Sequence, residues 1–273
     1  MGHWLADWLT LREPFDAAAR SVALTRAIAD ALPRDGALKI VDLGTGRGSN
    51  VRYLMGHLPR PQQWLLVDRD AALLAEVPQA MSGASDPRCA IETRQMNLGK
   101  LDPVIFKGRH LVTASALLDL VSETWLRSLA GHCHATDAAA LFALTYNGES
   151  HCAPVEAEDE TIRDLMNRHQ RANDKGFGRA AGPDAVNAAE RSFSDLGYRV
   201  QRAPSDWVLP TEARELQRRL VDEWAHAASE IAPEHTPMIR SWWRRRVAHV
   251  EAGRSRIIVG HEDLAAWPPK SRV

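Results

Sequence analysis

The fold is decided at residues 38–50, which read LKIVDLGTGRGSN. Residues 38–43 are mostly apolar, which is typical of a buried strand, and this strand ends next to the acidic Asp42. Three glycines follow at alternate positions, and such a run predicts a tight turn. Apolar residues then recur at helical spacing, at Val51, Leu54 and Leu58. The stretch therefore predicts a strand, a glycine turn and a helix.

Further strands and helices alternate along the chain in the same way. Apolar runs predict strands at residues 64–67, 90–95, 110–114, 138–145, 198–203 and 256–259. Strands that alternate with helices are the sequence form of a doubly wound parallel sheet, in which ligands bind beyond the carboxyl ends of the strands. We therefore predict an α/β fold with seven strands.

Composition narrows the classes of partner. The 273 residues suit one elaborated domain or two ordinary ones, and we expect one. Lys plus Arg number 34 and Asp plus Glu 35, so no global basic field attracts nucleic acid or anionic lipid. Three cysteines support no disulfide framework, and the first residues lack the pattern of a signal peptide. We expect a cytoplasmic protein without a nucleic-acid or membrane partner.

The glycine turn separates two classes of adenosine-binding protein. A dinucleotide oxidoreductase needs G-x-G-x-x-G, whose third glycine would fall at Ser49. Here an acid, Asp42, comes two residues before Gly44, Gly46 and Gly48. This pattern resembles motif I of the class I S-adenosylmethionine (SAM) dependent methyltransferases. The resemblance implies a Rossmann-like methyltransferase sheet, SAM as cofactor and S-adenosylhomocysteine as product.

The chemistry of SAM agrees with this resemblance. Glycines let the backbone approach a nucleoside, and an acid at a strand end offers negative charge to a sulfonium and an ammonium group. Asp68 ends the second strand 20 residues after Gly48, where the resemblance places an acid that accepts hydrogen bonds from both ribose hydroxyls. The predicted cofactor-binding residues are Arg20, Asp42, Gly44, Gly46, Gly48, Asn50, Asp68, Arg69, Asn97, Leu98 and Ser115.

Two of these assignments have structural alternatives. Asn97 and Leu98 stand where many relatives place an Asp-Leu pair near the adenine amino group, yet Asn97 suits a turn cap equally well. In relatives an arginine of the amino-terminal helices holds the SAM carboxylate, which favours Arg20. The i, i+4 spacing of Arg20 from Asp16 instead favours an ion pair.

The resemblance also divides the single predicted domain, residues 1–273, into parts. Residues 1–33 are expected to form an amino-terminal helical lid, and residues 36–146 the SAM-binding core. Two insertions, residues 147–182 and 209–253, are expected to cover the substrate, as such segments commonly do in this family.

Candidate groups for chemistry lie after the fourth and fifth strands. Asp119 suits substrate orientation, or stabilisation of a helix dipole from a first turn. His169 shares a helical face with Ile162, Leu165 and Met166, so it suits a general base or a core residue. Asp119 and His169 are the predicted catalytic residues. Those predicted to bind substrate are Tyr146, His169 and Lys175, the last of which also suits a solvated turn.

We therefore predict methyl transfer from SAM to an oxygen or nitrogen nucleophile of a small molecule, by a monomer or a homodimer. The alternatives are an RNA or protein methyltransferase, a nucleotide-dependent oxidoreductase and a non-catalytic SAM-binding protein. The residues after the fourth strand lack the Asn-Pro-Pro-Tyr type of tetrad that marks DNA adenine and glutamine methyltransferases. His132, Cys133 and His134 lack the second half of a zinc motif, so no metal is predicted.

Overall fold

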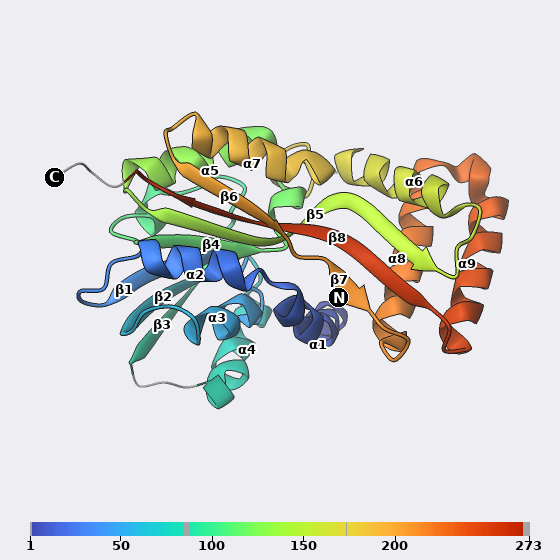
Figure 1. The fold of residues 1–273 in the computed structure, drawn as a ribbon, viewed down its shortest axis with the longest axis horizontal. Coiled ribbons are helices and arrows are strands. Elements are labelled where there is room, and N and C mark those ends of the chain that lie inside the picture. Colours follow the sequence, from blue (N-terminus) through green and yellow to red (C-terminus); the bar gives the residue numbers. More distant parts are fainter. Residues whose placement is uncertain (1, 85–87, 173, 270–273) are drawn as a thin grey trace.

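The computed structural model describes residues 2–84, 88–172 and 174–269 (Figure 1). In this part of the chain one sheet has the strand order β3-β2-β1-β4-β5-β8-β6, and β7 pairs with β8 at its side. The strands are β1 (Leu38–Leu43), β2 (Gln62–Asp68), β3 (Cys89–Gln95), β4 (Leu111–Ser115), β5 (Ala139–Ala153), β6 (Arg199–Pro204), β7 (Trp207–Leu209) and β8 (Arg256–Trp267). Strands β1 to β5 are mutually parallel, whereas β8 runs antiparallel to both β5 and β6.

Helices cover both faces of this sheet and extend beyond one end of it. They are α1 (Gly2–Ala19), α2 (Val22–Ala31), α3 (Ser49–Met55), α4 (Ala71–Met81), α5 (Glu123–Ala135), α6 (Asp159–Ala172), α7 (Ala185–Ser194), α8 (Arg214–Ile231) and α9 (Thr236–Glu251). Figure 1 shows α5 and α7 on one side of the sheet and α3 and α4 on the other. The mixed α/β fold that the hydrophobic pattern predicts is therefore confirmed.

Alternate residues of the central strands supply two separate hydrophobic cores. In β1, Leu38 and Ile40 pack toward α2, α3 and α4, whereas Val41 and Leu43 pack toward α5 and α7. Successive side chains of a strand point to opposite faces, so a strand buried on both faces is apolar at nearly every position. This two-sided burial holds the carboxyl ends of β1, β2 and β4 in one row.

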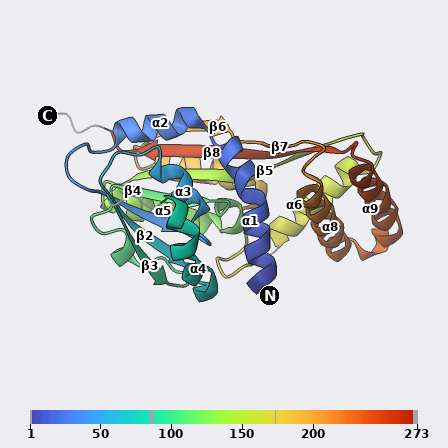
Figure 2. The same cartoon turned by 90° about the horizontal axis from the view of Figure 1, so that it is seen from below.

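A third core lies in a helical lobe, formed by α6, α8 and α9, at the right of Figure 1. Strands β5 and β8 run out of the sheet into this lobe, where residues 150–153 pair with residues 256–259. Helix α1 packs between the sheet and the lobe, and Figure 2 shows it crossing the molecule there. Because β5 and β8 belong to both parts, we propose that the chain is a single domain.

The strand count and the carboxyl ends of two strands differ most from the prediction. The short strand β7 makes eight strands in the described residues, β5 continues to Ala153, and β8 continues to Trp267. These extensions come from the antiparallel pairing of β5 with β8, which is interrupted by register shifts between Phe142 and Ser150. A pairing between residues more than 100 positions apart leaves no local periodic signal, so the sequence pattern does not reveal it.

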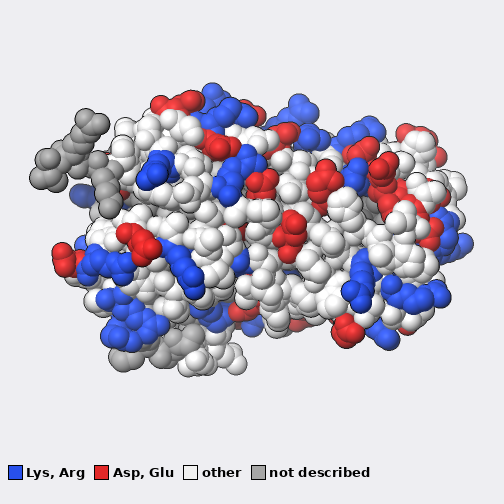
Figure 3. Space-filling view, in the orientation of Figure 1, with Lys and Arg blue, Asp and Glu red and all other residues white. Residues whose placement is uncertain are grey.

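The surface carries interspersed charges of both signs, as Figure 3 shows for one face. None of the helices in the described ranges is long and apolar enough to cross a membrane.

A buried ion pair lies inside the helical lobe. The fully buried Arg246 pairs with Asp159, whose carboxylate accepts hydrogen bonds from Arg246 Nε at 3.0 Å and from Trp242 Nε1 at 2.8 Å. This ion pair links α9 to the first turn of α6.

Substituting Asp159→Ala should lower the free energy of unfolding by about 3 to 5 kcal/mol, because it leaves the Arg246 guanidinium buried without a counter-charge. Urea denaturation followed by circular dichroism measures this change. Asp30→Ala is the control, because Asp30 and Arg34 form an exposed pair whose loss should cost less than about 1 kcal/mol. Equal costs for the two substitutions would contradict the assignment.

Candidate functional site

The glycine turn at the end of β1 is held from two sides. Gly44, Gly46 and Gly48 have positive φ angles of 66°, 54° and 80°, a backbone region that side chains other than glycine rarely adopt. The Gly46 N–H donates to Asp68 Oδ2 at 2.8 Å, and a Cβ added at Gly46 would lie 3.2 Å from Leu9 Cδ1 of α1. The turn therefore lies between the end of β2 and the amino-terminal helix.

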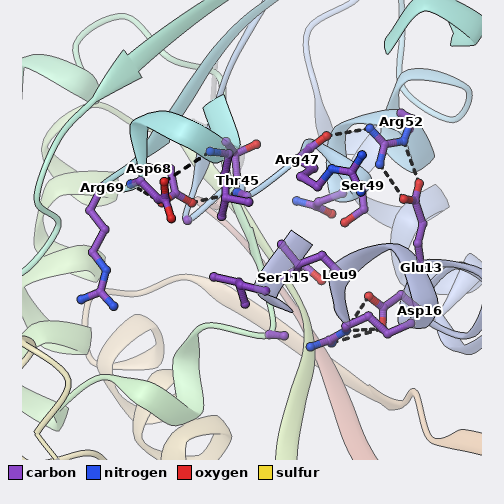
Figure 4. Close-up of a pocket in the computed structure, with 18 residues that line it drawn as sticks. Leu9, Glu13, Asp16, Thr45, Arg47, Ser49, Arg52, Asp68, Arg69 and Ser115 are labelled. Atoms are coloured by element: carbon purple, nitrogen blue, oxygen red, sulfur yellow. Dashed lines mark hydrogen bonds and ion pairs between the residues drawn. The ribbon is translucent and has the colours of Figure 1, made fainter. Parts of the chain in front are cut away.

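Two connected chambers lie over this turn. The first, of about 220 Å³, lies between the turn, the end of β2 and α1, as Figure 4 shows. The second, of about 180 Å³, extends toward residues 98, 117 and 120. Each is smaller than the roughly 300 Å³ of an ordinary small-molecule site. They are nevertheless contiguous, because both are lined by Gly44, Asp68, Arg69, Ser115 and Ala116.

A third chamber, of about 250 Å³, continues from the first past Ser49 and Asn50 to Arg20. Ser115, at the end of β4, lines all three chambers. The chambers thus follow the carboxyl ends of β1, β2 and β4, where the strand order reverses, which is the place that open α/β sheets use for ligands.

A buried polar network lies behind the third chamber. Asn50 Nδ2 donates to Asp42 Oδ1 at 2.6 Å and to Thr113 Oγ1 at 3.1 Å, while Arg20 Nη1 donates to Asn50 Oδ1 at 2.6 Å. Burial raises the pKa of Asp42 to about 6, and the nearby Arg20 charge opposes that increase. Asn50 thus stands between Asp42 and the chambers and joins two buried charges of opposite sign.

Arg20 has hydrogen-bonding capacity to spare. Only 6% of the residue is exposed, its guanidinium lies 4.5 Å from the centre of the Tyr53 ring, and its Nε is 3.9 Å from Asp263. Within the described residues, Nε and Nη2 have no hydrogen-bond partner. A buried cation with two unused donors beside a cavity can receive an anionic group of a ligand.

Helix α1 is attached to the glycine turn by ion pairs and hydrogen bonds. Glu13 accepts from Arg52 Nε at 2.7 Å and from Arg52 Nη2 at 2.6 Å, and Arg47 contacts Thr10 and the Ala6 carbonyl (Figure 4). The sequence pattern did not predict the ion pair between Glu13 and Arg52, because these residues are 39 positions apart in the chain. Helix α1, which supplies five residues of the lining, therefore covers the first chamber.

Comparisons with known proteins bear on the fold. No protein-family model and no curated protein sequence matches this chain. Among solved structures, a Bacillus halodurans protein that has been proposed to be a methyltransferase is similar at a TM-score of 0.52 and 12% identity, over 92% of this chain and 100% of that one. The cyclopropane synthase MmaA2 of Mycobacterium tuberculosis is similar at a TM-score of 0.47 and 11% identity, over 89% and 83%.

This chain has the class I methyltransferase fold. The chambers lie at the carboxyl ends of β1, β2 and β4, and they bring together most of the residues predicted to bind the cofactor. Around them lie Arg20, Gly44, Gly46, Asn50, Asp68, Arg69, Leu98 and Ser115, with Asp42 behind Asn50. The glycine pattern and the acid at the end of β2 therefore lie at the three chambers.

Asn97 is not brought to these chambers. Its Oδ1 accepts the Gly99 N–H at 2.9 Å, which is the turn-capping role, and its side chain is exposed. The next residue, Leu98, is buried and lines the second chamber with Leu117, Leu120 and Phe177. Sequence reasoning missed these last three residues. The sequence marks them only as apolar residues that follow a strand or lie between two glycines. Many residues of the core have the same character, so this feature does not identify a pocket.

His169 is also not brought to the site, which corrects its assignment as a general base. Its Nε2 lies 2.7 Å from Glu230 Oε2 of α8, at the surface of the helical lobe. The inward face that helical spacing predicts is the face toward α8 and not toward the glycine turn. Tyr146 is buried with its hydroxyl donating to Asn167 Oδ1 at 3.0 Å, whereas the exposed Lys175 lines the second chamber.

Asp119 follows β4 in a short 3₁₀ helix (Leu118–Leu120), and it does not line the three chambers as described. It is buried, and its Oδ1 has no hydrogen-bond partner among the described residues. Burial raises the pKa of Asp119 to about 6, against the opposing charges of Lys175 and Arg12.

The pKa of Asp119 predicts the sign of a pH effect on stability. Folding raises this pKa, so the native state binds more protons than the unfolded state between about pH 4 and 6, and the stability contribution falls as the pH rises through that window. Asp119→Asn cannot ionise. Wild type therefore loses stability between these pH values and the variant does not. The free energy of unfolding of the variant minus that of wild type should be roughly 1 to 3 kcal/mol larger at pH 7.5 than at pH 4. Urea titrations at both pH values measure it, and a pH-independent difference would contradict it.

Proposed function

We propose that this chain binds SAM and transfers its methyl group to an oxygen or nitrogen nucleophile of a small molecule. One observation carries the proposal. Asp68 and the unused donors of Arg20 stand at separate places along connected chambers, with the glycine turn between them. A ligand with a ribose toward one end and a carboxylate at the other satisfies both groups.

The ribose end is supported by the capacity of Asp68. Its two carboxylate oxygens each accept one backbone N–H, from Gly46 at 2.8 Å and from Asp70 at 2.9 Å. A carboxylate has about four acceptor sites, so two remain for the hydroxyls of a ribose. The backbone bonds orient the carboxylate before any ligand enters.

The amino-acid end is supported by the mixed charges of the third chamber. Arg20 offers a planar fork that suits a carboxylate, and Glu13 and Asp16 line the same chamber and suit an ammonium group. An amino acid that carries both charges matches this arrangement.

SAM, when bound, supplies a methyl group on a sulfonium that is already a strong electrophile. The chain therefore has mainly to orient the reactants and to exclude water. Leu5 and Leu9 of α1 line the first chamber with apolar side chains, which exclude water from it. Asp119 remains our proposed group for orienting the acceptor, from the residues that follow β4. His169 has no part in this proposal, because Glu230 holds it in the lobe.

A small acceptor is supported by the enclosure of the chambers under α1 and by the net charge of -1. The same charge balance disfavours nucleic acid as a partner. The three cysteines are all free, which supports a reducing compartment such as the cytoplasm. We propose the activity for a monomer or a homodimer.

Isothermal titration calorimetry tests the donor assignment directly. SAM and S-adenosylhomocysteine should both bind, and Asp68→Ala should weaken each by roughly 1 to 3 kcal/mol, because the ribose loses hydrogen bonds to a charged group. Asp30→Ala, an exposed carboxylate on α2, should leave both affinities unchanged. Binding of NADH in place of these two ligands would overturn the proposal.

Arg20→Lys tests the carboxylate end separately. Lysine keeps the charge and loses the planar fork, so affinity for S-adenosylhomocysteine should fall roughly tenfold. 5′-Methylthioadenosine lacks the amino-acid part, so its affinity should not change. If calorimetry shows equal losses for both ligands, Arg20 does not hold the carboxylate.

A further inference from the structure

Residues 174–178 form a compact loop that leaves the helical lobe after α6. One carboxylate oxygen sets its shape, because Asp174 Oδ1 accepts the N–H groups of Gly176 at 2.7 Å, Phe177 at 3.1 Å and Gly178 at 3.0 Å. Three converging hydrogen bonds leave the loop backbone little freedom. The loop therefore holds a defined shape against the rest of the molecule.

Two close approaches place this loop against the edge of the sheet. A Cβ added at Gly99 would lie 2.2 Å from the Gly176 carbonyl oxygen, and one added at Gly178 would lie 3.2 Å from Ser122 Oγ. Arg69 Nη1 also donates to the Lys175 carbonyl at 3.3 Å. The backbones of the Gly99 turn and of the loop are thus in direct contact, which any side chain at residue 99 would prevent.

The loop brings an aromatic ring to the second chamber. Phe177 lines that chamber and meets Trp125 edge to face, with ring centres 5.9 Å apart. Trp125 Nε1 in turn donates to the Leu98 carbonyl at 2.6 Å, so one tryptophan supports both Phe177 and the Leu98 backbone. The remaining apolar lining comes from residues 116, 117 and 120.

The position of Asp68 decides what this chamber would hold. Asp68 lines both the first and the second chamber, and the first leads on to Arg20. If the donor's ribose is at Asp68 and its carboxylate at Arg20, the base attached to that ribose has the second chamber left to it. Flat bases stack well on aromatic and aliphatic side chains.

We propose that residues 174–178 form the outer wall of the subsite for the donor's purine base, with Phe177 as its stacking surface and Gly99 as the residue that lets the loop close. This inference rests on the proposed function. It replaces the expectation that Lys175 and its loop cover the acceptor. The first insertion therefore contributes to donor binding as well as to the helical lobe.

Gly99→Ala tests the wall, because the new methyl group would displace the Gly176 carbonyl. Gly131→Ala is the matched control: it makes the same change in α5, where no atom outside the adjoining backbone of that helix lies within 4 Å of the new methyl group. Phe177→Ala is the second test, and it keeps the proposal falsifiable if Gly99→Ala does not fold by circular dichroism. Calorimetry with S-adenosylhomocysteine and with 5′-methylthioadenosine is the measurement.

Phe177→Ala should weaken both ligands by the same factor, roughly fivefold to 150-fold, the range for losing one stacked base. Gly99→Ala should weaken both equally as well, and Gly131→Ala neither. Wild-type affinity for both ligands in Gly99→Ala and Phe177→Ala would overturn the wall and leave SAM binding intact. Failure of wild type to bind either ligand would overturn this inference and the proposed function together.

Discussion

The Asn50 amide is the link on which the pocket depends. Asp42 and Arg20 are buried charges from distant parts of the chain, and isolated burial would strongly destabilise either. Asn50 donates to the first and accepts from the second, both at 2.6 Å, so each charge has a partner without direct contact between them. The same residue lies in the first turn of α3, directly after the glycine turn. The end of β1, the turn and the lid are therefore held around one side chain.

Asp263 of β8, whose Oδ2 lies 3.9 Å from Arg20 Nε, extends this link to β5 and β8. Its oxygens accept the N–H of Ser21, which caps α2, and the N–H of Leu144, in the irregular part of β5. Leu144 has a positive φ of 55°, and Ala116, which lines two chambers, has one of 51°. Such conformations persist where the surroundings hold them in place. Asp263 thus links the start of α2 to the irregular part of β5.

The residues predicted for the site fall into those that lie at the chambers and those that lie elsewhere. Residues in the glycine motif, with Asp68 at the end of β2, lie at the chambers because strand ends and turns are local features that parallel pairing brings to one edge. Arg20 also reaches them. His169 and Asn97 do not, since their patterns predict a buried face and a polar turn but not which neighbour either one meets. Phe177 belongs to no periodic or motif pattern in the sequence. The contact between its loop and Gly99 brings it to the second chamber.

The sequence by itself determined the α/β class, the order of the core elements and the edge of the sheet at which the chambers lie. Those features follow from hydrophobic period and from the conformational freedom of glycine, which act over a few residues. Only the tertiary structure decided that β5 and β8 extend into a helical lobe, that α1 lies on the glycine turn through Glu13 and Arg52, and that His169 pairs with Glu230. Each of these is a contact between segments far apart in the chain. Such contacts depend on how whole elements pack, and no local spacing records that packing.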